Sequence, residues 1–218
     1  MNTIGSGPDG HTAPAFASRS RPTLAVIETG SANLASVLAA FRRAGVEVST
    51  TRDPDVVRSA DRVVLPGVGA FGSVMARLAE LGVADAVRER VEAGAPFLAI
   101  CLGMQVLARG SEESPGVPGL GLMEGTVRRF PEMSTVPQLG WNRVSTEAGA
   151  ALVRDGYAFF ANSFYVEAVP EGWSPAWATH DVRFVAAVER GPQLACQFHP
   201  ELSGAWGASL LERWYTAC

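Results

Sequence analysis

Residues 97–105 read Phe97-Leu98-Ala99-Ile100-Cys101-Leu102-Gly103-Met104-Gln105, and no other stretch says more about the fold. An apolar run typical of a buried strand stops at Cys101, and a glycine and helix-forming residues follow at once. This order is typical of a nucleophile elbow, a sharp strand-to-helix turn that exposes one side chain above the end of a sheet. The start of a helix would also favour negative charge on the Cys101 sulfur. A lone cysteine there is more often a small buried residue, but this context favours a nucleophile.

Strands and helices alternate on both sides of this stretch. Apolar runs predict strands at 24–28, 46–50, 62–65 and 97–100, and helical spacing predicts helices at 33–44, 73–80 and 83–93. This alternation predicts an α/β fold, a doubly wound and mostly parallel sheet with flanking helices. The second half is richer in strands, which we expect at 126–130, 157–161, 184–188 and 194–198, before a last helix at 205–215.

The composition is that of a globular protein. The 218 residues are 47% hydrophobic and 18% charged, with a net charge of -4, so we expect neither a nucleic-acid nor a membrane partner. All 18 basic residues are arginine, which excludes a Schiff-base lysine and a Walker-type phosphate loop. We expect no cofactor and no metal. Three cysteines without framework spacing favour a reducing compartment, the cytoplasm.

Residues 1–21 are rich in Gly, Ser, Pro and Ala and lack the hydrophobic segment of a secretion signal. We expect them to form a disordered leader, and residues 22–218 to form a single domain.

A second group of reactive residues lies far downstream, in the stretch 197–201. His199 follows a predicted strand, and Glu201 could turn back to orient its imidazole towards Cys101, which would give a nucleophile, a base and an orienting carboxylate. We expect Pro200 to prevent a helix from starting at once. The alternative is an ordinary surface His-Pro-Glu turn.

A glycine-rich loop at 66–69 follows another predicted strand, so it should lie at the same sheet edge as Cys101. Its backbone N–H groups, at Gly67 and Val68, could stabilise a developing oxyanion, with the N–H of Leu102 as a second donor. A simple tight turn is the other interpretation.

Taken together, these motifs resemble the class I, triad-type glutamine amidotransferases, most closely the branch that forms the glutaminase subunit of imidazole glycerol phosphate synthase. The matching stretches follow the family's order and extend from residue 23 to the C-terminus: Thr29-Gly30-Ser31-Ala32-Asn33-Leu34, Leu65-Pro66-Gly67-Val68-Gly69-Ala70-Phe71, Ile100 to Gln105, Ser111-Glu112-Glu113, Leu139-Gly140-Trp141-Asn142 and Gln197-Phe198-His199-Pro200-Glu201.

The resemblance implies a glutaminase domain in which Cys101 attacks the side-chain amide of L-glutamine, His199 relays protons and Glu201 orients the histidine. It implies that glutamine is held by Gly67, Gln105, Glu113 and the backbone at Ser163 and Phe164. Ammonia would pass to a (β/α)₈-barrel synthase subunit of histidine biosynthesis, which would form a heterodimer with this chain and activate it through the loop at Val68.

Several positions around the mouth of the expected site depart from the family pattern. Ala99 replaces a glycine, Gln138 and Asn162 replace histidines, and Leu202 replaces a basic residue. The resemblance places Asn33, Gln138, Trp141, Asn162 and Leu202 at the partner interface. The departures are explained equally by a paralogue that feeds a diverged barrel in a specialised pathway and by drift within the family.

Two other functions remain open at this stage. A stand-alone cysteine hydrolase would use the triad but would leave Trp141, Asn142 and the 66–69 loop without a role. A non-catalytic regulatory subunit would keep a barrel active without chemistry of its own, and would not need Cys101, His199 or Glu201.

Overall fold

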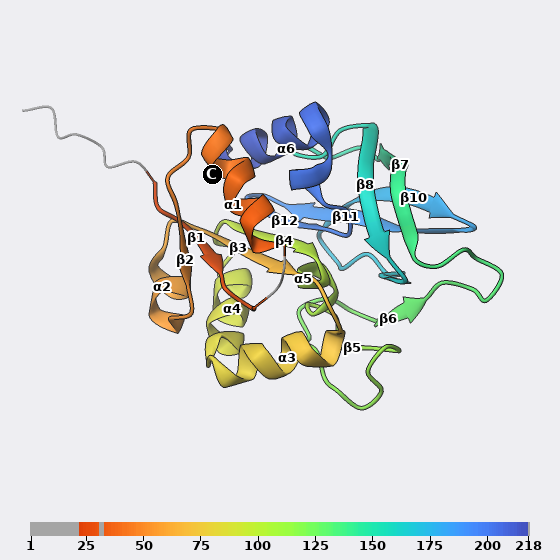
Figure 1. Ribbon diagram of the computed structural model, residues 1–218, viewed down its shortest axis with the longest axis horizontal. Coiled ribbons are helices and arrows are strands. Elements are labelled where there is room, and N and C mark those ends of the chain that lie inside the picture. The colour runs from red at the N-terminus through yellow and green to blue at the C-terminus, as the bar shows by residue number, and fades with distance from the viewer. Residues whose placement is uncertain (1–21, 31–32, 218) are drawn as a thin grey trace, which may run out of the picture.

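The computed structural model describes residues 22–30 and 33–217, so the expected leader, Ser31, Ala32 and Cys218 lie outside the described residues. Figure 1 shows a twisted central sheet with helices packed on both faces. The helices are α1 (Leu34–Arg43), α2 (Pro54–Ser59), α3 (Phe71–Glu80), α4 (Val83–Glu92), α5 (Leu102–Gln105), the 3₁₀ turn η1 (Pro200–Leu202) and α6 (Gly204–Thr216).

The sheet has nine strands in the order β2-β1-β3-β4-β12-β11-β10-β7-β8, and β5, β6 and β9 form a smaller one. The strands are β1 (Leu24–Ile27), β2 (Val48–Thr51), β3 (Arg62–Gly67), β4 (Phe97–Cys101), β5 (Gly110–Ser111), β6 (Thr126–Arg129), β7 (Gln138–Thr146), β8 (Gly156–Asn162), β9 (Phe164–Tyr165), β10 (Ser174–His180), β11 (Val182–Arg190) and β12 (Gln193–Cys196).

The main sheet has a parallel and an antiparallel half. Strands β2, β1, β3, β4 and β12 are parallel to one another, and β11, β10, β7 and β8 continue the sheet as antiparallel neighbours. The predicted α/β fold with a largely parallel core sheet and flanking helices is confirmed. β4 lies between β3 and β12, so the end of β4 meets the ends of both neighbours.

Two apolar layers explain why the parallel strands have uninterrupted apolar runs. In β1, Leu24 and Val26 pack in one layer with Phe41 of α1, whereas Ala25 and Ile27 pack in the other. Figure 1 shows α1 and α6 on one face of the sheet and α2, α3 and α4 on the other. Because both faces are covered, most residues of the central strands are buried and apolar.

Three elements of more than three residues, α2, β7 and β10, were not expected from the sequence. The short helix α2 begins with Asp53, whose side chain accepts from the Asp55 N–H at 2.8 Å, and Pro54 takes the first helical position. In β7 the outward residues Leu139 and Trp141 are apolar and exposed, which hides the alternation expected of a strand. β10 contains a proline at its start, which weakens the strand signal.

None of the helices in the described part of the chain is long and apolar enough to cross a membrane.

Candidate active site

Cys101 occupies the expected sharp turn. It is the last residue of β4 and has φ 54° and ψ -111°, a conformation that non-glycine residues rarely adopt. A Cβ atom on Gly103 would lie 2.1 Å from the Leu65 carbonyl oxygen, and one on Gly67 would lie 2.6 Å from the Gly103 nitrogen. The elbow therefore packs directly against the end of β3, which only glycine permits at these two positions.

The helix after the elbow is shorter than the sequence pattern suggests, because α5 ends at Gln105 after one turn. The N–H groups of Leu120 and Leu122 donate to the carbonyls of Val106 and Leu107 at 2.8 Å each. This returning segment satisfies carbonyls that a longer helix would have used. The helix dipole at Cys101 is correspondingly that of a single turn.

His199 and Glu201 meet as predicted. His199 Nδ1 lies 2.7 Å from Glu201 Oε1, and both side chains are almost completely buried. Asn33 at the start of α1 donates its side-chain amide to the same Oε1 and lies 3.2 Å from His199 Nδ1. The expectation that Pro200 would delay a helix was wrong: Pro200 opens η1, because a proline is compatible with a first helical position while His199 before it stays extended.

The environment of His199 favours its charged form. Burial lowers the pKa of this imidazole, but hydrogen bonds with the side chains of Cys101 and Glu201 outweigh burial and raise the pKa from 6.5 to about 10. Since Nδ1 bonds Glu201, the other ring nitrogen is the one that faces Cys101. The imidazole thus interacts with the Cys101 side chain on one side and hydrogen-bonds the Glu201 carboxylate on the other.

Sequence reasoning missed a functional role for Gln197, although it lies two residues before His199. Its side chain is fully buried, and its Nε2 donates to the Cys101 sulfur at 3.5 Å. The Oε1 of Gln197 accepts a hydrogen bond from Gln105 Nε2 at 2.8 Å. Gln105 Nε2 also donates to the Phe164 carbonyl at 3.0 Å. Gln105 therefore both lines the site and fixes the amide that contacts the nucleophile.

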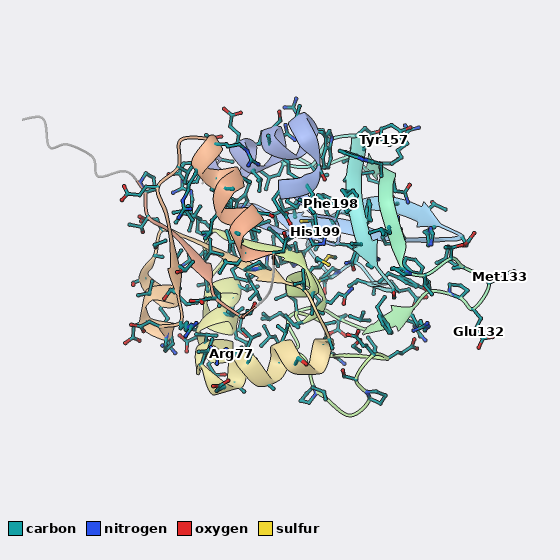
Figure 2. All side chains as sticks on the ribbon, viewed as in Figure 1. Arg77, Glu132, Met133, Tyr157, Phe198 and His199 are labelled. Carbon is teal, nitrogen blue, oxygen red and sulfur yellow. The ribbon has the colours of Figure 1, made fainter. Side chains whose placement is uncertain are left out.

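A pocket of about 350 Å³ opens above Cys101 and His199, and Figure 2 shows His199 near the middle of the molecule. Its size suits a small ligand. Besides these two residues, it is lined by Val68, Gly69, Leu102, Gln105, Glu113, Arg129, Pro137, Ala161, Asn162, Ser163 and Phe164.

Most of the predicted substrate and oxyanion residues therefore lie together around the nucleophile. Gly67 contributes to the packing of the elbow, as described above, and is the register partner of Cys101. Glu113 accepts a hydrogen bond from the Phe71 N–H at 2.6 Å, which holds its carboxylate at the N-terminus of α3. Arg129 and Pro137 also line the pocket but were not singled out from the sequence.

The five residues expected at a partner interface differ in their exposure. Trp141 and Leu202 are 58% and 41% exposed, whereas Gln138 and Asn162 are buried. Asn33 points its amide at Glu201 and His199. Only Trp141 and Leu202 of these five thus present a substantial apolar surface.

The other described cysteine, Cys196, is buried, and burial raises the pKa of its thiol well above the ordinary value for cysteine. Among the described residues there is no group of three or more His, Cys, Asp or Glu side chains placed to hold a metal ion.

Fold and site together have the arrangement found in triad-type cysteine enzymes built on a doubly wound α/β sheet. The family model for "Glutamine amidotransferase class-I" matches residues 25–218. The chain therefore belongs to the class I glutamine amidotransferases.

Its relatives within this family are more specific. The chain is 41% identical over 195 residues to imidazole glycerol phosphate synthase subunit HisH of Symbiobacterium thermophilum, covering 88% of this chain and 92% of that one. It is 44% identical over 186 residues to a HisH subunit of Thermus thermophilus, with 85% and 93% covered. A solved structure described as a glutamine amidotransferase matches with a TM-score of 0.70 at 24% identity over 88% of this chain and 96% of that chain, which supports the fold.

Proposed function

We propose that this chain is the glutaminase subunit of imidazole glycerol phosphate synthase and supplies ammonia from L-glutamine for histidine biosynthesis. The observation that carries this proposal is that His199, hydrogen-bonded to Glu201, lines the same amino-acid-sized pocket as Cys101. The similarity to HisH subunits over most of the chain supports the same role. The same role assigns the chain to the cytoplasm, where Cys101 and Cys196 would stay reduced.

The first half of the reaction is acylation of Cys101. Its sulfur attacks the side-chain amide carbon of glutamine, and the amide oxygen becomes an oxyanion. The N–H groups of Val68 and Leu102 are the donors that we assign to this oxyanion, because both residues line the pocket beside the nucleophile. His199 gives a proton to the departing nitrogen, so ammonia leaves and a γ-glutamyl thioester remains.

The second half is hydrolysis of the thioester. His199, now able to accept a proton, takes one from a water molecule that attacks the thioester carbonyl. Glutamate and the free Cys101 sulfur are released. Glu201 holds the imidazole orientation throughout, and Asn33 in turn holds Glu201, so the base stays aligned in both steps.

The partner we propose is a (β/α)₈-barrel synthase subunit that binds the exposed face of β7 and β8. Side chains on this face are large, apolar and solvent-exposed: Leu139 is 70% exposed, Trp141 58% and Tyr157 61%. Trp141 and Phe159 pair across the two strands, and their rings are in edge-to-face contact with centroids 6.3 Å apart. Figure 2 shows Tyr157 at the outer end of β8. Exposed aromatic side chains beside a catalytic pocket are typical of a protein interface.

The deciding experiment measures glutamate release from L-glutamine by the purified chain, alone and with a histidine-pathway barrel subunit carrying its nucleotide ligand. We expect strong activation by the barrel and loss of both activity and thioester formation in Cys101→Ala. The variant Trp141→Ala should keep the fold but weaken barrel binding. A chain that turns over fully without any partner would instead be a stand-alone hydrolase.

One observation favours a second candidate, a paralogous subunit with a diverged barrel. The exposed Leu202 replaces a cation at the rim of the site, which removes a charge-assisted contact with a standard partner. A competition binding experiment against a standard barrel separates the two: tight binding with normal activation excludes the diverged partner. A regulatory subunit without chemistry is excluded if Cys101→Ala abolishes glutamine-dependent synthesis.

A further inference from the structure

The pocket above Cys101 is lined by one basic and one acidic side chain in addition to His199. Apart from His199 of the triad, Arg129 is the one cationic side chain and Glu113 the one carboxylate among the described residues that line it. The substrate of the proposed glutaminase carries one α-carboxylate and one α-ammonium group, in addition to the amide that reacts at Cys101. The pocket therefore contains one complementary charge for each end of a free amino-acid head group.

The backbone segments that carry the two charged residues are joined through Glu112. Glu112, next to Glu113, accepts from the Arg129 backbone N–H at 2.8 Å, and its own N–H donates to the Val127 carbonyl at 2.9 Å. Arg129 is also the register partner of Phe164, whose neighbour Ser163 lines the same pocket. The backbone thus fixes where Arg129 and Glu113 enter the site relative to each other.

The guanidinium of Arg129 is available for a ligand. Among the described residues no carboxylate forms an ion pair with it, and its contact is the face of the Phe164 ring, 5.6 Å from the ring centroid. The adjacent Arg128 differs, because its guanidinium is paired with Glu112 and Glu167. Successive residues of a strand point to opposite faces, so only Arg129 is directed to the pocket.

We propose that Arg129 is a specificity-determining residue that binds the α-carboxylate of glutamine, opposite Glu113 at the α-ammonium group. This assignment rests on the proposed glutaminase function. A guanidinium presents a planar pair of donors that matches a carboxylate, and stacking on Phe164 would orient it. The pocket would then select free glutamine over glutamine whose carboxylate is blocked, as it is within a peptide.

The test uses the complex with the barrel subunit and compares Arg129→Met, Arg129→Lys and the matched control Arg128→Met. Each is assayed with L-glutamine and with L-glutamine α-amide, in which a neutral amide replaces the α-carboxylate. Arg129→Met should raise the KM for glutamine about tenfold, equivalent to one charge-assisted hydrogen bond, with little change in kcat. It should leave the KM for the α-amide unchanged. Arg129→Lys should recover part of the loss, and Arg128→Met should behave as the unsubstituted complex.

A second readout needs neither turnover nor a partner. The alkylation rate of Cys101 by 6-diazo-5-oxo-L-norleucine, which carries the amino-acid head group, should fall in Arg129→Met. The rate with iodoacetamide, which has no head group, should not. Equal KM increases for both substrates, or equal slowing with both alkylators, would show that Arg129 acts only structurally and would overturn the proposal.

Failure of the glutaminase function is recognised separately. If the unsubstituted complex releases no glutamate, the proposed function fails. If it does release glutamate and Arg129→Met retains full preference for the free carboxylate, only the assignment of Arg129 fails.

Discussion

The side-chain amide of Gln197 donates to the sulfur of Cys101 at 3.5 Å, from a position that is completely buried. The amide cannot turn over freely, because its oxygen accepts from Gln105. The Cys101 sulfur therefore has a fixed donor in Gln197, in addition to His199, to which we assign proton transfer.

We predict that Gln197→Met will slow alkylation of Cys101 by iodoacetamide about tenfold, because the hydrogen bond to the reacting sulfur is lost. Gln197→Glu should be slower still, since it places a carboxylate beside the reacting sulfur and repels negative charge that develops there. Thermal unfolding of both variants controls for loss of structure. Unchanged reactivity in a folded Gln197→Glu protein would contradict the assigned contact.

The titration of His199 gives a second prediction. Its pKa in the folded protein is about 10, raised from 6.5 by hydrogen bonds with Cys101 and Glu201 in spite of burial. We expect the imidazole resonances of His199 in an NMR titration to remain those of the protonated ring at neutral pH. Glu201→Gln should lower the midpoint, because it removes the charge partner. A midpoint near 6.5 in the unsubstituted protein would contradict this account.

The same shift has a consequence for stability. A raised folded-state pKa means that the folded protein holds the proton more tightly, so the stabilisation is fully present below pH 6.5 and is lost as the pH rises through about 10. The difference in unfolding free energy between the protein and His199→Gln should therefore shrink over that interval. Chemical denaturation at several pH values measures it, and a difference that grows with pH would have the wrong sign.

The elbow itself is testable by adding one methyl group. Gly103→Ala would place a Cβ 2.1 Å from the Leu65 carbonyl, so we expect it to destabilise the fold by about 3 kcal/mol or to misplace Cys101. Gly110→Ala is the matched control, because its nearest neighbour is the Val117 carbonyl at 3.6 Å. Denaturant unfolding should separate the two, and equal stability would show that the elbow can relax.

Backbone strain at the nucleophile gives a further prediction. Cys101 holds φ 54°, so Cys101→Gly should be more stable than Cys101→Ala by about 1–2 kcal/mol although neither variant has a nucleophile. Both should be inactive towards glutamine. If the alanine variant is as stable as the glycine variant, the backbone conformation at Cys101 carries no strain. The position of the nucleophile would then have no cost in stability.

Much of the fold could be predicted because its signals are local. Strands β1, β3 and β4 are covered on both faces, which gives short unbroken apolar runs. β7 and β10 were missed for the opposite reason: exposed apolar side chains in β7 and a proline in β10 obscure their patterns. The sequence also contained the start signal of α2, Asp53-Pro54, which was not recognised.

Local sequence was enough to place Cys101 on a tight strand-to-helix turn and to pair His199 with Glu201. Each of these depends on residues within a few positions of one another, where backbone geometry leaves few choices. Long-range packing was needed to bring Gln197 to the sulfur and Asn33 to Glu201, and to stop α5 after one turn. It also placed Arg129 and Glu113 in one pocket. Those relationships join segments far apart in the chain, and they are fixed by strand register and packing rather than by any local pattern.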